Sequence, residues 1–336
     1  MTKPKIPMKQ AVSIPVSECE SFGSITLAGR EMNVTQEMLL KGNSIGKGFN
    51  GFVSEIVIDG MLLARKDIRV KEEADPLRKY SQRELDVIKH TKGCPYIVQY
   101  YGTFSQKNSS RRQISLFMER LPWSGMDLIR QGKEKPENGK IQMIPDFVIG
   151  RITTAVVHVL RYLKSKNVMQ RDIKPSNILI DHDGRVKVCD FGICAMLENS
   201  IATTLIGTSQ YNAPEKCLEK KCYTVKTDIW SLGITIYELA TLEHPFLQPL
   251  NLYNAFMSKT PPILPDTYSK EIREFTRECL QIDPENRAGL EKIVSLSFFK
   301  EHNVPFEFLG TGLKPLDAKC VRRKSVGAWL DKFFLE

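Results

Sequence analysis

The sequence has no long continuous apolar segment. A membrane-spanning helix needs roughly 20 consecutive apolar residues, and no run in the 336-residue chain approaches that length. The first residues, MTKPKIP, lead into no apolar core of the kind that a secretory signal peptide contains. No internal repeat is visible either. We therefore expect neither a secretory signal nor a membrane anchor, and no membrane partner.

The cysteines lack the spacing of a metal or redox motif. Eight are scattered along the chain, and the nearest pairs are Cys189/Cys194 and Cys217/Cys222. Neither pair has the Cys-x-x-Cys spacing of a zinc knuckle or a dithiol centre. We expect buried or idle reduced thiols, as in an intracellular protein.

Composition and charge are those of an ordinary globular protein with a basic balance. Apolar residues make up 42% of the chain and charged residues 26%, which argues against extensive disorder and against a fibrous repeat. The net charge of +9 suits phosphate-rich ligands, acidic partners or nucleic acid. No clustered basic helix or aromatic–basic module supports the nucleic-acid alternative, so we expect no nucleic-acid partner. The length allows two domains, or one bilobal domain with tails.

The N-terminal part of the chain changes character near residue 40. Residues 1–40 carry prolines, serines and isolated apolar residues without periodicity, which predicts a flexible tail. Residues 41–121 alternate short apolar runs with turn residues, which indicates strands, and one charged, periodic stretch over 80–90 indicates a helix. The runs at 45–58 and 61–68 predict a hairpin of strands.

Residues 122–302 are mainly helical by their periodicity. Segment 147–166 places seven apolar residues on one helical face, and 230–242 and 269–280 are further helix candidates. Residues 303–336 begin irregularly. They end in a short amphipathic helix with Val326, Trp329, Leu330 and Phe333 at positions i, i+3, i+4 and i+7.

A glycine-rich segment is the first motif that carries chemistry. It reads Gly46-x-Gly48-x-x-Gly51-x-Val53, a spacing that lets backbone N–H groups approach phosphate oxygens. A strand follows it instead of the helix of a dinucleotide-binding loop. An ordinary hairpin is the plain alternative for this motif alone.

A lysine in the next apolar run is the second motif. Lys66 follows Ala64 and Arg65, and a lysine in an apolar strand is costly unless it is paired. Glu84, on the predicted helix, is the best candidate partner. The plain alternative is an edge-strand lysine whose stem lies along apolar surface.

Three further motifs follow in a fixed order. They are Arg171-Asp172 with Asn177 five residues after the aspartate, then Asp190-Phe191-Gly192, then Ala213-Pro214-Glu215. Each alone could be a chance turn. Together with the glycine loop, the strand lysine and the helix glutamate, in this order, they have almost no other explanation.

The set of motifs resembles that of eukaryotic protein kinases over residues 41–302. The resemblance implies an α+β, bilobal fold with a small β-rich N-lobe (41–121) and a larger, mainly helical C-lobe (122–302). It also implies ATP and Mg²⁺ as cofactors.

The resemblance also implies a role for each matching residue. Lys66, held by Glu84, grips the ATP phosphates, Asp172 accepts or orients the substrate's hydroxyl proton, and Lys174 lies near the γ-phosphate. Asn177 and Asp190 hold Mg²⁺. The implied nucleotide site comprises Ile45, Gly46, Lys47, Gly48, Gly51, Val53, Ala64, Lys66, Met118 as gatekeeper, Glu119 and Leu121 in the adenine-binding hinge, and Asn177.

One position departs from the kinase pattern. Gln170 stands where the family usually has a histidine that packs beneath the phenylalanine of Asp-Phe-Gly. Glutamine can keep a hydrogen bond but not the flat ring packing. The alternative to an active kinase is therefore a pseudokinase or scaffold, although every predicted metal and phosphate ligand is present. Elsewhere, Glu215 is expected to pair with Arg287, and Asp228–Gly233 to brace the helical lobe.

The activation segment indicates which group of protein kinases the sequence resembles. Ser200-Ile-Ala-Thr-Thr204 is similar to the S-x-A-x-S/T pattern of MAP kinase kinases, in which both hydroxyl positions are phosphorylated by an upstream kinase. Several other stretches, such as 233–241, resemble the stress-activated branch of that family. The implied activity is phosphorylation of the Thr and Tyr of a T-x-Y motif in a stress-activated MAP kinase. The implied partners are that substrate and an upstream MAP kinase kinase kinase.

The two ends of the chain carry candidate docking segments. Lys3, Lys5 and Lys9 followed by Val12 and Ile14 resemble a MAP kinase docking peptide. The C-terminal helix resembles a docking helix for upstream kinases, but it could equally cap its own lobe. The family implies a cytoplasmic location, with nuclear entry left open.

Overall fold

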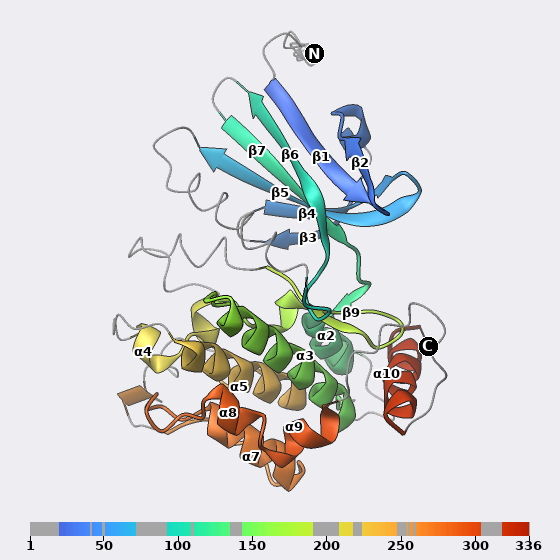
Figure 1. Ribbon diagram of the computed structural model, residues 1–336. Coiled ribbons are helices and arrows are strands. Elements are labelled where there is room, and N and C mark those ends of the chain that lie inside the picture. Colours follow the sequence, from blue (N-terminus) through green and yellow to red (C-terminus); the bar gives the residue numbers. More distant parts are fainter. Residues whose placement is uncertain are drawn as a thin grey trace, which may run out of the picture. The chain divides into compact units, whose positions relative to one another are not determined.

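The chain forms two compact units (Figure 1). The structure is a computed structural model and describes residues 20–40, 42–48, 51–71, 93–108, 111–134, 143–190, 208–217, 224–246, 254, 256–257, 260–303 and 318–335. One unit comprises the described residues within Met1–Asp75 and Tyr101–Met118. The other comprises those within Pro76–Tyr100 and Glu119–Glu336. The first is built of strands and the second mainly of helices, so the predicted α+β, bilobal fold is confirmed.

The boundary between the units differs from the predicted one at residues 93–100 and 119–121. Both segments belong to the helical unit, although the sequence assigned them to the N-lobe. Backbone pairing explains the difference at residues 93–100. Val188 accepts a hydrogen bond from the Val98 N–H and donates one to the Tyr96 carbonyl, at 3.0 and 2.8 Å, so this segment is bound to a strand of the second unit.

A seven-stranded sheet carries the first unit. Its strands lie in the order β2-β1-β6-β7-β5-β4-β3. Their bounds are β1 Glu20–Leu27, β2 Arg30–Asn33, β3 Asn43–Gly48, β4 Gly51–Ile58, β5 Met61–Lys71, β6 Tyr100–Asn108 and β7 Arg111–Glu119.

The predicted hairpin is confirmed in β4 and β5. The two strands pair antiparallel up to Ile58 and Met61, which leaves Asp59 and Gly60 as a two-residue turn. Both turn residues have positive φ, at 50° and 74°, the conformation that an Asp-Gly turn favours between right-twisted strands. Alternate residues of the hairpin are buried in the core of the sheet together with residues from elsewhere in the unit. The core residues are Ile25, Leu27, Val34, Ile56, Ile58, Leu63, Phe104 and Phe117.

Residues 20–40 are ordered, which corrects the expectation of a flexible tail over residues 1–40. β1 and β2 form a hairpin around Ala28 and Gly29, and a 3₁₀ turn follows at Glu37–Leu40. Ile25 and Leu27 of β1 are buried in the core of the sheet. Two apolar residues at period two are too short a pattern to stand out in a polar segment. Residues 1–19, with the candidate docking peptide, lie outside the described residues.

Helices and one small sheet make up the second unit. The helices are α2 Gly125–Glu134, α3 Asp146–Ser165, α4 Pro214–Cys217, α5 Val225–Thr241, α7 Lys270–Cys279, α8 Leu290–Ile293, α9 Ser297–His302 and α10 Ala318–Leu335. The strands are β8 Trp123–Ser124, β9 Ile178–Ile180 and β10 Val186–Val188, in the order β10-β9-β8. Short 3₁₀ turns lie at Pro175–Asn177 and Thr208–Tyr211.

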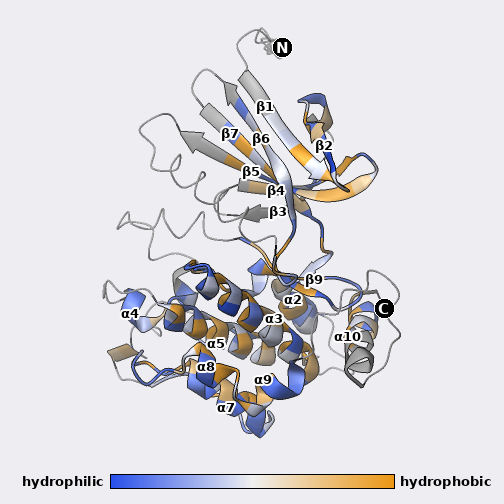
Figure 2. Ribbon diagram, in the orientation of Figure 1, coloured by the Kyte–Doolittle hydropathy of each residue, from blue (hydrophilic) through white to orange (hydrophobic). Residues whose placement is uncertain are grey.

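The three predicted helices are confirmed as α3, α5 and α7. All seven apolar residues of the predicted face in α3 are buried. Helix α5 carries apolar residues along its length (Figure 2), and most of its residues are buried. It starts five residues before the predicted start because Thr224 forms a capping box with Thr227. Every helix in the part of the chain that the structure describes is too short or too polar to cross a bilayer.

Helix α10 packs against its own unit. Val326, Leu330 and Phe333 are buried, with 2%, 0% and 2% of their surface exposed. The Gln131 side chain of α2 donates a hydrogen bond to the Phe333 carbonyl at 2.9 Å, and Phe334 stacks on Trp123 of β8. This packing is what the capping alternative predicts, and the docking alternative stays a prediction.

Candidate active site

Three polar side chains of the predicted site meet at one point. Asp172, Lys174 and Asn177 lie in the loop between α3 and β9, and Asp172 and Asn177 are buried. The Lys174 ammonium is 2.9 Å from Asp172 Oδ2, and the Asn177 amide donates to the same oxygen at 2.7 Å. The carboxylate is therefore held in one orientation by a cation and an amide.

A short 3₁₀ turn explains why residues five apart meet. Pro175 occupies the start of the turn, where its fixed φ suits a helical conformation and its missing N–H is not needed. The Asn177 N–H donates to the Lys174 carbonyl at 3.0 Å. The turn folds Asn177 back, so its side chain also donates to the Asp172 carbonyl at 2.9 Å.

Asp228 in the first turn of α5 fixes the backbone of this loop. Its carboxylate is 1% exposed and accepts hydrogen bonds from the N–H groups of Arg171 and Gln170, at 2.9 and 3.3 Å. Arg171 has a φ of 64°, which is costly for a residue with a side chain. The buried carboxylate stabilises that conformation and confirms the expected brace.

Asp190 follows β10 and has a φ of 57°. The N–H of its neighbour Cys189 donates to the Asn177 carbonyl at 2.9 Å. The segments that carry the two predicted metal ligands are thus directly bonded to each other. The two ligands offer an amide oxygen and a carboxylate. Because the Asn177 N–H₂ group donates to Asp172, its Oδ1 is the atom left to bind a cation.

Gln170 makes the contacts that link the loop to Asp190. The side chain is fully buried, and its amide donates to the carbonyls of Cys189 and Asp190, at 3.2 and 3.1 Å. Its Oε1 is also buried and has no hydrogen-bond partner within the described ranges. A glutamine here does make hydrogen bonds to this segment, at the cost of one unsatisfied acceptor.

The predicted nucleotide residues of the first unit lie along β3, β4 and β5. Val53 is directly opposite Lys66 in the β4–β5 pair, and Ala64 and Lys66 are buried. The glycines Gly46, Gly48 and Gly51 lie where β3 meets β4, with Lys47 between the first two. Ile45 is 42% exposed at an irregularity in the same pair. Of the remaining predicted nucleotide residues, Asn177 lies in the turn described above, and the others are the gatekeeper Met118 and the hinge residues.

The hinge residues lie at the end of β7 and just beyond it. Met118 and Leu121 are buried, and Glu119 donates its backbone N–H to the Gln99 carbonyl at 2.9 Å. The Glu119 carboxylate pairs with Lys187 of β10 at 2.5 Å. Sequence reasoning missed this ion pair, because the partners are 68 residues apart and no local pattern connects them.

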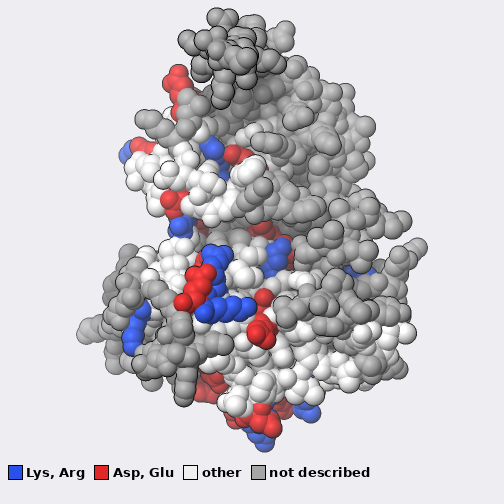
Figure 3. Space-filling view, turned by 180° about the vertical axis from the view of Figure 1, so that it is seen from behind, with Lys and Arg blue, Asp and Glu red and all other residues white. Residues whose placement is uncertain are grey.

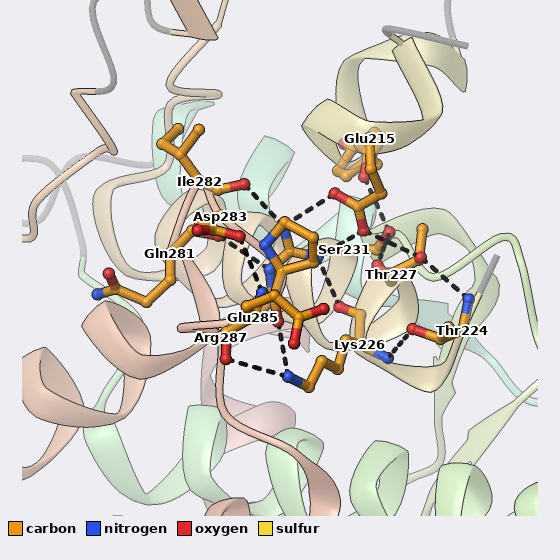
Figure 4. A network of polar contacts seen from close by, with 12 residues as sticks. Glu215, Thr224, Lys226, Thr227, Ser231, Gln281, Ile282, Asp283, Glu285 and Arg287 are labelled. Carbon is orange, nitrogen blue, oxygen red and sulfur yellow. Dashed lines mark hydrogen bonds and ion pairs between the residues drawn. The ribbon is translucent and has the colours of Figure 1, made fainter. Parts of the chain in front are cut away.

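The predicted pair between Glu215 and Arg287 is confirmed (Figure 4). Two parallel bonds join the guanidinium to the carboxylate, at 2.7 and 3.0 Å, and Thr227 donates to the same carboxylate at 3.1 Å. Both partners are buried. Burial opposes ionisation of Glu215, but the hydrogen bonds and charge of Arg287 outweigh it, so the pKa of Glu215 is lowered.

A second buried pair was missed by sequence reasoning. The Tyr211 hydroxyl donates to Glu238 of α5 at 2.5 Å, and Ser231 donates to the Tyr211 carbonyl at 2.8 Å. Burial raises the pKa of Glu238 and of Tyr211. Helix α5 therefore holds the segment before Ala213-Pro214-Glu215 as well as the catalytic loop.

Some predicted site residues cannot be placed. Glu84, Ser200 and Thr204 lie outside the described residues, as do Phe191 and Gly192 after Asp190. The pairing of Lys66 with Glu84 stays a prediction, and so does the role of the two hydroxyl positions.

Acidic and basic side chains are intermixed on the face shown in Figure 3. In the helical unit, blue and red groups lie next to one another. Ion pairs of this unit include Arg185 with Asp183 and Lys292 with Glu278, at 3.1 and 2.7 Å.

Comparison with known proteins places most of the chain in one family. The model of the protein kinase domain matches residues 39–299. The chain is 35% identical to "MAP kinase kinase skh1/pek1" of Schizosaccharomyces pombe, over 80% of this chain and 75% of that protein. It is 32% identical to "Protein kinase wis1" of the same yeast, over 83% of this chain and 45% of that protein.

A mammalian relative is also a MAP kinase kinase by name. The chain is 30% identical to "Dual specificity mitogen-activated protein kinase kinase 7" of Mus musculus, over 91% of this chain and 57% of that protein. The chain thus spans about half the length of two of these three relatives.

Proposed function

The chain belongs to the protein kinase family and, within it, to the dual-specificity MAP kinase kinases, and we propose from this premise that it phosphorylates a threonine and a tyrosine in the activation loop of a stress-activated MAP kinase. The observation that carries the proposal is the cluster of Asp172, Lys174 and Asn177. The Lys174 ammonium and the Asn177 amide nitrogen lie 2.9 and 2.7 Å from the same Asp172 oxygen, Oδ2. Such a cluster can take a proton and steady a phosphate at the same time.

Asp172 is the residue that would receive the proton. The substrate's hydroxyl oxygen forms a bond to the γ-phosphorus of ATP as the bond to the ADP oxygen breaks, and the hydroxyl proton passes to Asp172. Lys174, paired with that carboxylate, offers positive charge to the transferring phosphoryl group. Because Lys174 and Asn177 both bond to Oδ2 of Asp172, the other carboxylate oxygen, Oδ1, is the one that would accept the proton.

Asn177 and Asp190 would hold the divalent cation. Members of this family use ATP with a divalent metal, and two protein oxygens suit Mg²⁺, which keeps water and phosphate oxygens in its remaining positions. The cation would offset the charge that builds on the phosphates. Asn177 Oδ1 and the Asp190 carboxylate are hard oxygen donors of the required kind.

Each unit contains residues that the resemblance to protein kinases assigns to nucleotide binding. Backbone N–H groups of Gly46–Gly51 are suited to phosphate oxygens, and Lys66 to the α- and β-phosphates with Glu84 as its partner. Ala64, Met118 and the hinge from Glu119 to Leu121 would contact the adenine. Support comes from the register that sets Val53 opposite Lys66, and from the burial of Ala64 and Met118.

Activation would proceed through Ser200 and Thr204. Phosphorylation by an upstream MAP kinase kinase kinase adds about −1.5 to −2 charges at each site, and such groups pair readily with arginine. Arg171, next to the catalytic aspartate, is the candidate arginine. A cytoplasmic location is part of the same proposal, as are the two docking segments.

The scaffold alternative rests on Gln170 alone. In favour of an active enzyme, the Gln170 amide reaches the carbonyls of both Cys189 and Asp190. The residue that departs from the family pattern therefore still contacts the metal-binding segment, and we favour phosphoryl transfer.

A panel of substrates tests the proposed substrate class. Protein phosphorylated by an upstream kinase would be incubated with ATP, Mg²⁺ and kinase-dead MAP kinases of each class. We expect transfer to the stress-activated class and none from the Asp190→Ala variant. Equal silence toward every class would support the scaffold, whereas transfer only to a growth-factor-type MAP kinase would overturn the stress assignment.

A further inference from the structure

Three separate backbone segments of the second unit converge on one ion pair. The Lys187 ammonium of β10 lies 2.5 Å from Glu119 Oε1. The same oxygen accepts a hydrogen bond from the backbone N–H of Gln99 at 2.7 Å. The segments are the hinge, the stretch 93–99 and the strand that leads to Asp190.

The hinge and Gln99 are bonded in both directions. The Glu119 N–H donates to the Gln99 carbonyl at 2.9 Å, while the Glu119 side chain accepts from the Gln99 N–H. Both the backbone N–H and the backbone carbonyl of Gln99 are thus hydrogen-bonded to Glu119. The orientation of the Glu119 peptide is set by its own carboxylate as well as by its backbone.

The stretch 93–99 is in turn joined to β10. Val188 bonds to Tyr96 and Val98 on either side, and Ile97 forms a parallel bridge to Val188. Lys187 immediately precedes Val188, and Asp190 is three residues after Lys187. A shift of Lys187 therefore moves the strand that ends two residues before the predicted metal ligand.

The Glu119–Lys187 ion pair is largely shielded from solvent. The Lys187 and Glu119 side chains are 16% and 22% exposed, against 51% and 80% for the ion pair between Lys164 and Glu291 on the surface. Exposed ion pairs contribute little, because solvent screens them and two long side chains must be ordered. A sheltered pair that also accepts a backbone N–H loses more when one partner is removed.

We propose that the Glu119–Lys187 ion pair is a positioning element for nucleotide binding. It joins the hinge, which would contact the adenine, to the strand that precedes Asp190, which would bind the metal. The inference rests on the proposed function only in that ATP occupies the hinge. Neither side chain needs to touch ATP, so both act as positioning residues through the backbone of Glu119 and of β10.

Direct nucleotide binding tests the proposal. Lys187→Met removes the charge and keeps the length of the stem, while Lys187→Arg keeps the pair. Affinity for Mg-ATP would be measured by calorimetry without any protein substrate, alongside KM for ATP, kcat and thermal stability. Lys164→Met, which breaks the exposed pair with Glu291, is the matched control.

The expected result is a selective loss of nucleotide affinity. Lys187→Met should raise Kd and KM for ATP roughly 5- to 20-fold with kcat changed by less than about 2-fold, the range that coupled contacts produce. Lys187→Arg should restore most of the affinity, and Lys164→Met should bind ATP as the wild type does. Adding Glu119→Gln to Lys187→Met should cost little more, since one interaction is lost only once.

Other outcomes would overturn the inference. Unchanged ATP affinity in Lys187→Met, with or without a lower melting temperature, would show that the pair serves the fold alone. Additive losses from Glu119→Gln and Lys187→Met would show that the two residues act independently. If Lys187→Met fails to fold, the comparison of Lys187→Arg with Lys187→Gln decides, and equal ATP affinity in those two variants contradicts the proposal.

The two proposals fail separately. A wild-type protein that binds ATP but phosphorylates no MAP kinase would contradict the proposed function and leave this test intact. A Lys187→Met variant with wild-type ATP affinity contradicts only the positioning role.

Discussion

At the scale of single residues, Gln170 shows how a substitution at a buried position changes what its neighbours can do. The family's usual histidine would offer a flat ring, whereas this side chain offers an amide that bonds two successive carbonyls. The gain in hydrogen bonds is offset by a buried Oε1 without a partner in the described part of the chain. The sequence alone identified the unusual residue, but not which of its two polar atoms would be satisfied.

Replacing Gln170 by methionine should destabilise the protein. The change keeps the size and removes the donor, which leaves two sheltered carbonyls without that bond and costs about 1–3 kcal/mol. Urea unfolding of Gln170→Met against the wild type measures the effect. Gln170→His, which retains a ring N–H, should lose less, and a methionine variant as stable as the wild type would contradict the account.

The buried pair of Glu215 and Arg287 makes stability depend on pH. The folded-state pKa of Glu215 lies below its ordinary value of 4.5, so its contribution is complete above that pH and is lost as the pH falls through the lowered value. Glu215→Gln leaves the arginine charge buried without its partner and should cost about 3–5 kcal/mol at pH 7. Unfolding measured at several pH values should show the gap to wild type narrowing below about pH 4.5.

Glu238, in the same helical unit, should make stability depend on pH in the opposite direction. Burial raises its pKa, so its contribution is complete below 4.5 and is lost as the pH rises through the raised value. Glu238→Gln keeps an oxygen that can accept from the Tyr211 hydroxyl. Its stability relative to the wild type should therefore increase with pH, and the same trend in both variants would contradict these assignments.

At the scale of elements, a glycine in the second turn of α3 marks a close contact between two helices. A β-carbon on Gly150 would lie 2.2 Å from the ring of His302 in α9. On the next turn of α3, Thr154 donates to the His302 carbonyl at 3.0 Å. The glycine lets α9 approach the longest helix of the unit, and the helical period of α3 gave no hint of it.

Gly150→Ala should destabilise the protein although alanine favours helices. The propensity gain of roughly 1 kcal/mol is smaller than the expected cost of overpacking, about 1–3 kcal/mol and occasionally more. Thermal unfolding measures the net change. Adding His302→Ala should recover part of the loss, and a purely additive double variant would show that the two sites do not meet.

Gly327 plays a similar part in α10. A β-carbon there would lie 2.4 Å from the His182 carbonyl, in the turn between β9 and β10. Glycine in a helix interior is less favourable than alanine by roughly 1 kcal/mol. The structure explains it as the point where the helix backbone approaches the lobe.

Gly327→Ala should loosen the docking of α10. The overlap with the His182 carbonyl costs about 1–3 kcal/mol if the helix must shift. Hydrogen exchange of the α10 amides should become faster, and tryptophan fluorescence should change because Trp123 stacks on Phe334. Ala328→Ser, at the exposed neighbouring position, is the control. Unchanged exchange in Gly327→Ala would contradict the close packing.

At the scale of the whole molecule, the sequence predicted the fold class and the loop chemistry because both rest on local patterns. The catalytic loop needs only a short 3₁₀ turn to bring Asp172 and Asn177 together. The β1–β2 hairpin was not predicted, because too few apolar residues mark it. The Glu119–Lys187 and Tyr211–Glu238 pairs depend on tertiary contacts between distant segments, which no spacing rule reveals.

Regulation of the molecule should depend on Ser200 and Thr204. Changing both to alanine should leave ATP affinity within about 2-fold of wild type and remove the activation that an upstream kinase provides, since each phosphate adds the charge that orders such segments. The rate of MAP kinase phosphorylation before and after treatment with the upstream kinase measures this. Full activation of the double-alanine protein would contradict the assignment of these two sites.

The most direct test of the central claim is a mass-spectrometric reading of one peptide. A kinase-dead stress-activated MAP kinase would be incubated with the activated protein, ATP and Mg²⁺, and its activation-loop peptide analysed, with Asp172→Asn as the negative control. The account predicts phosphate on both the threonine and the tyrosine of the same peptide, and none with the control. A peptide that stays unmodified, or equal modification with Asp172→Asn, would contradict it.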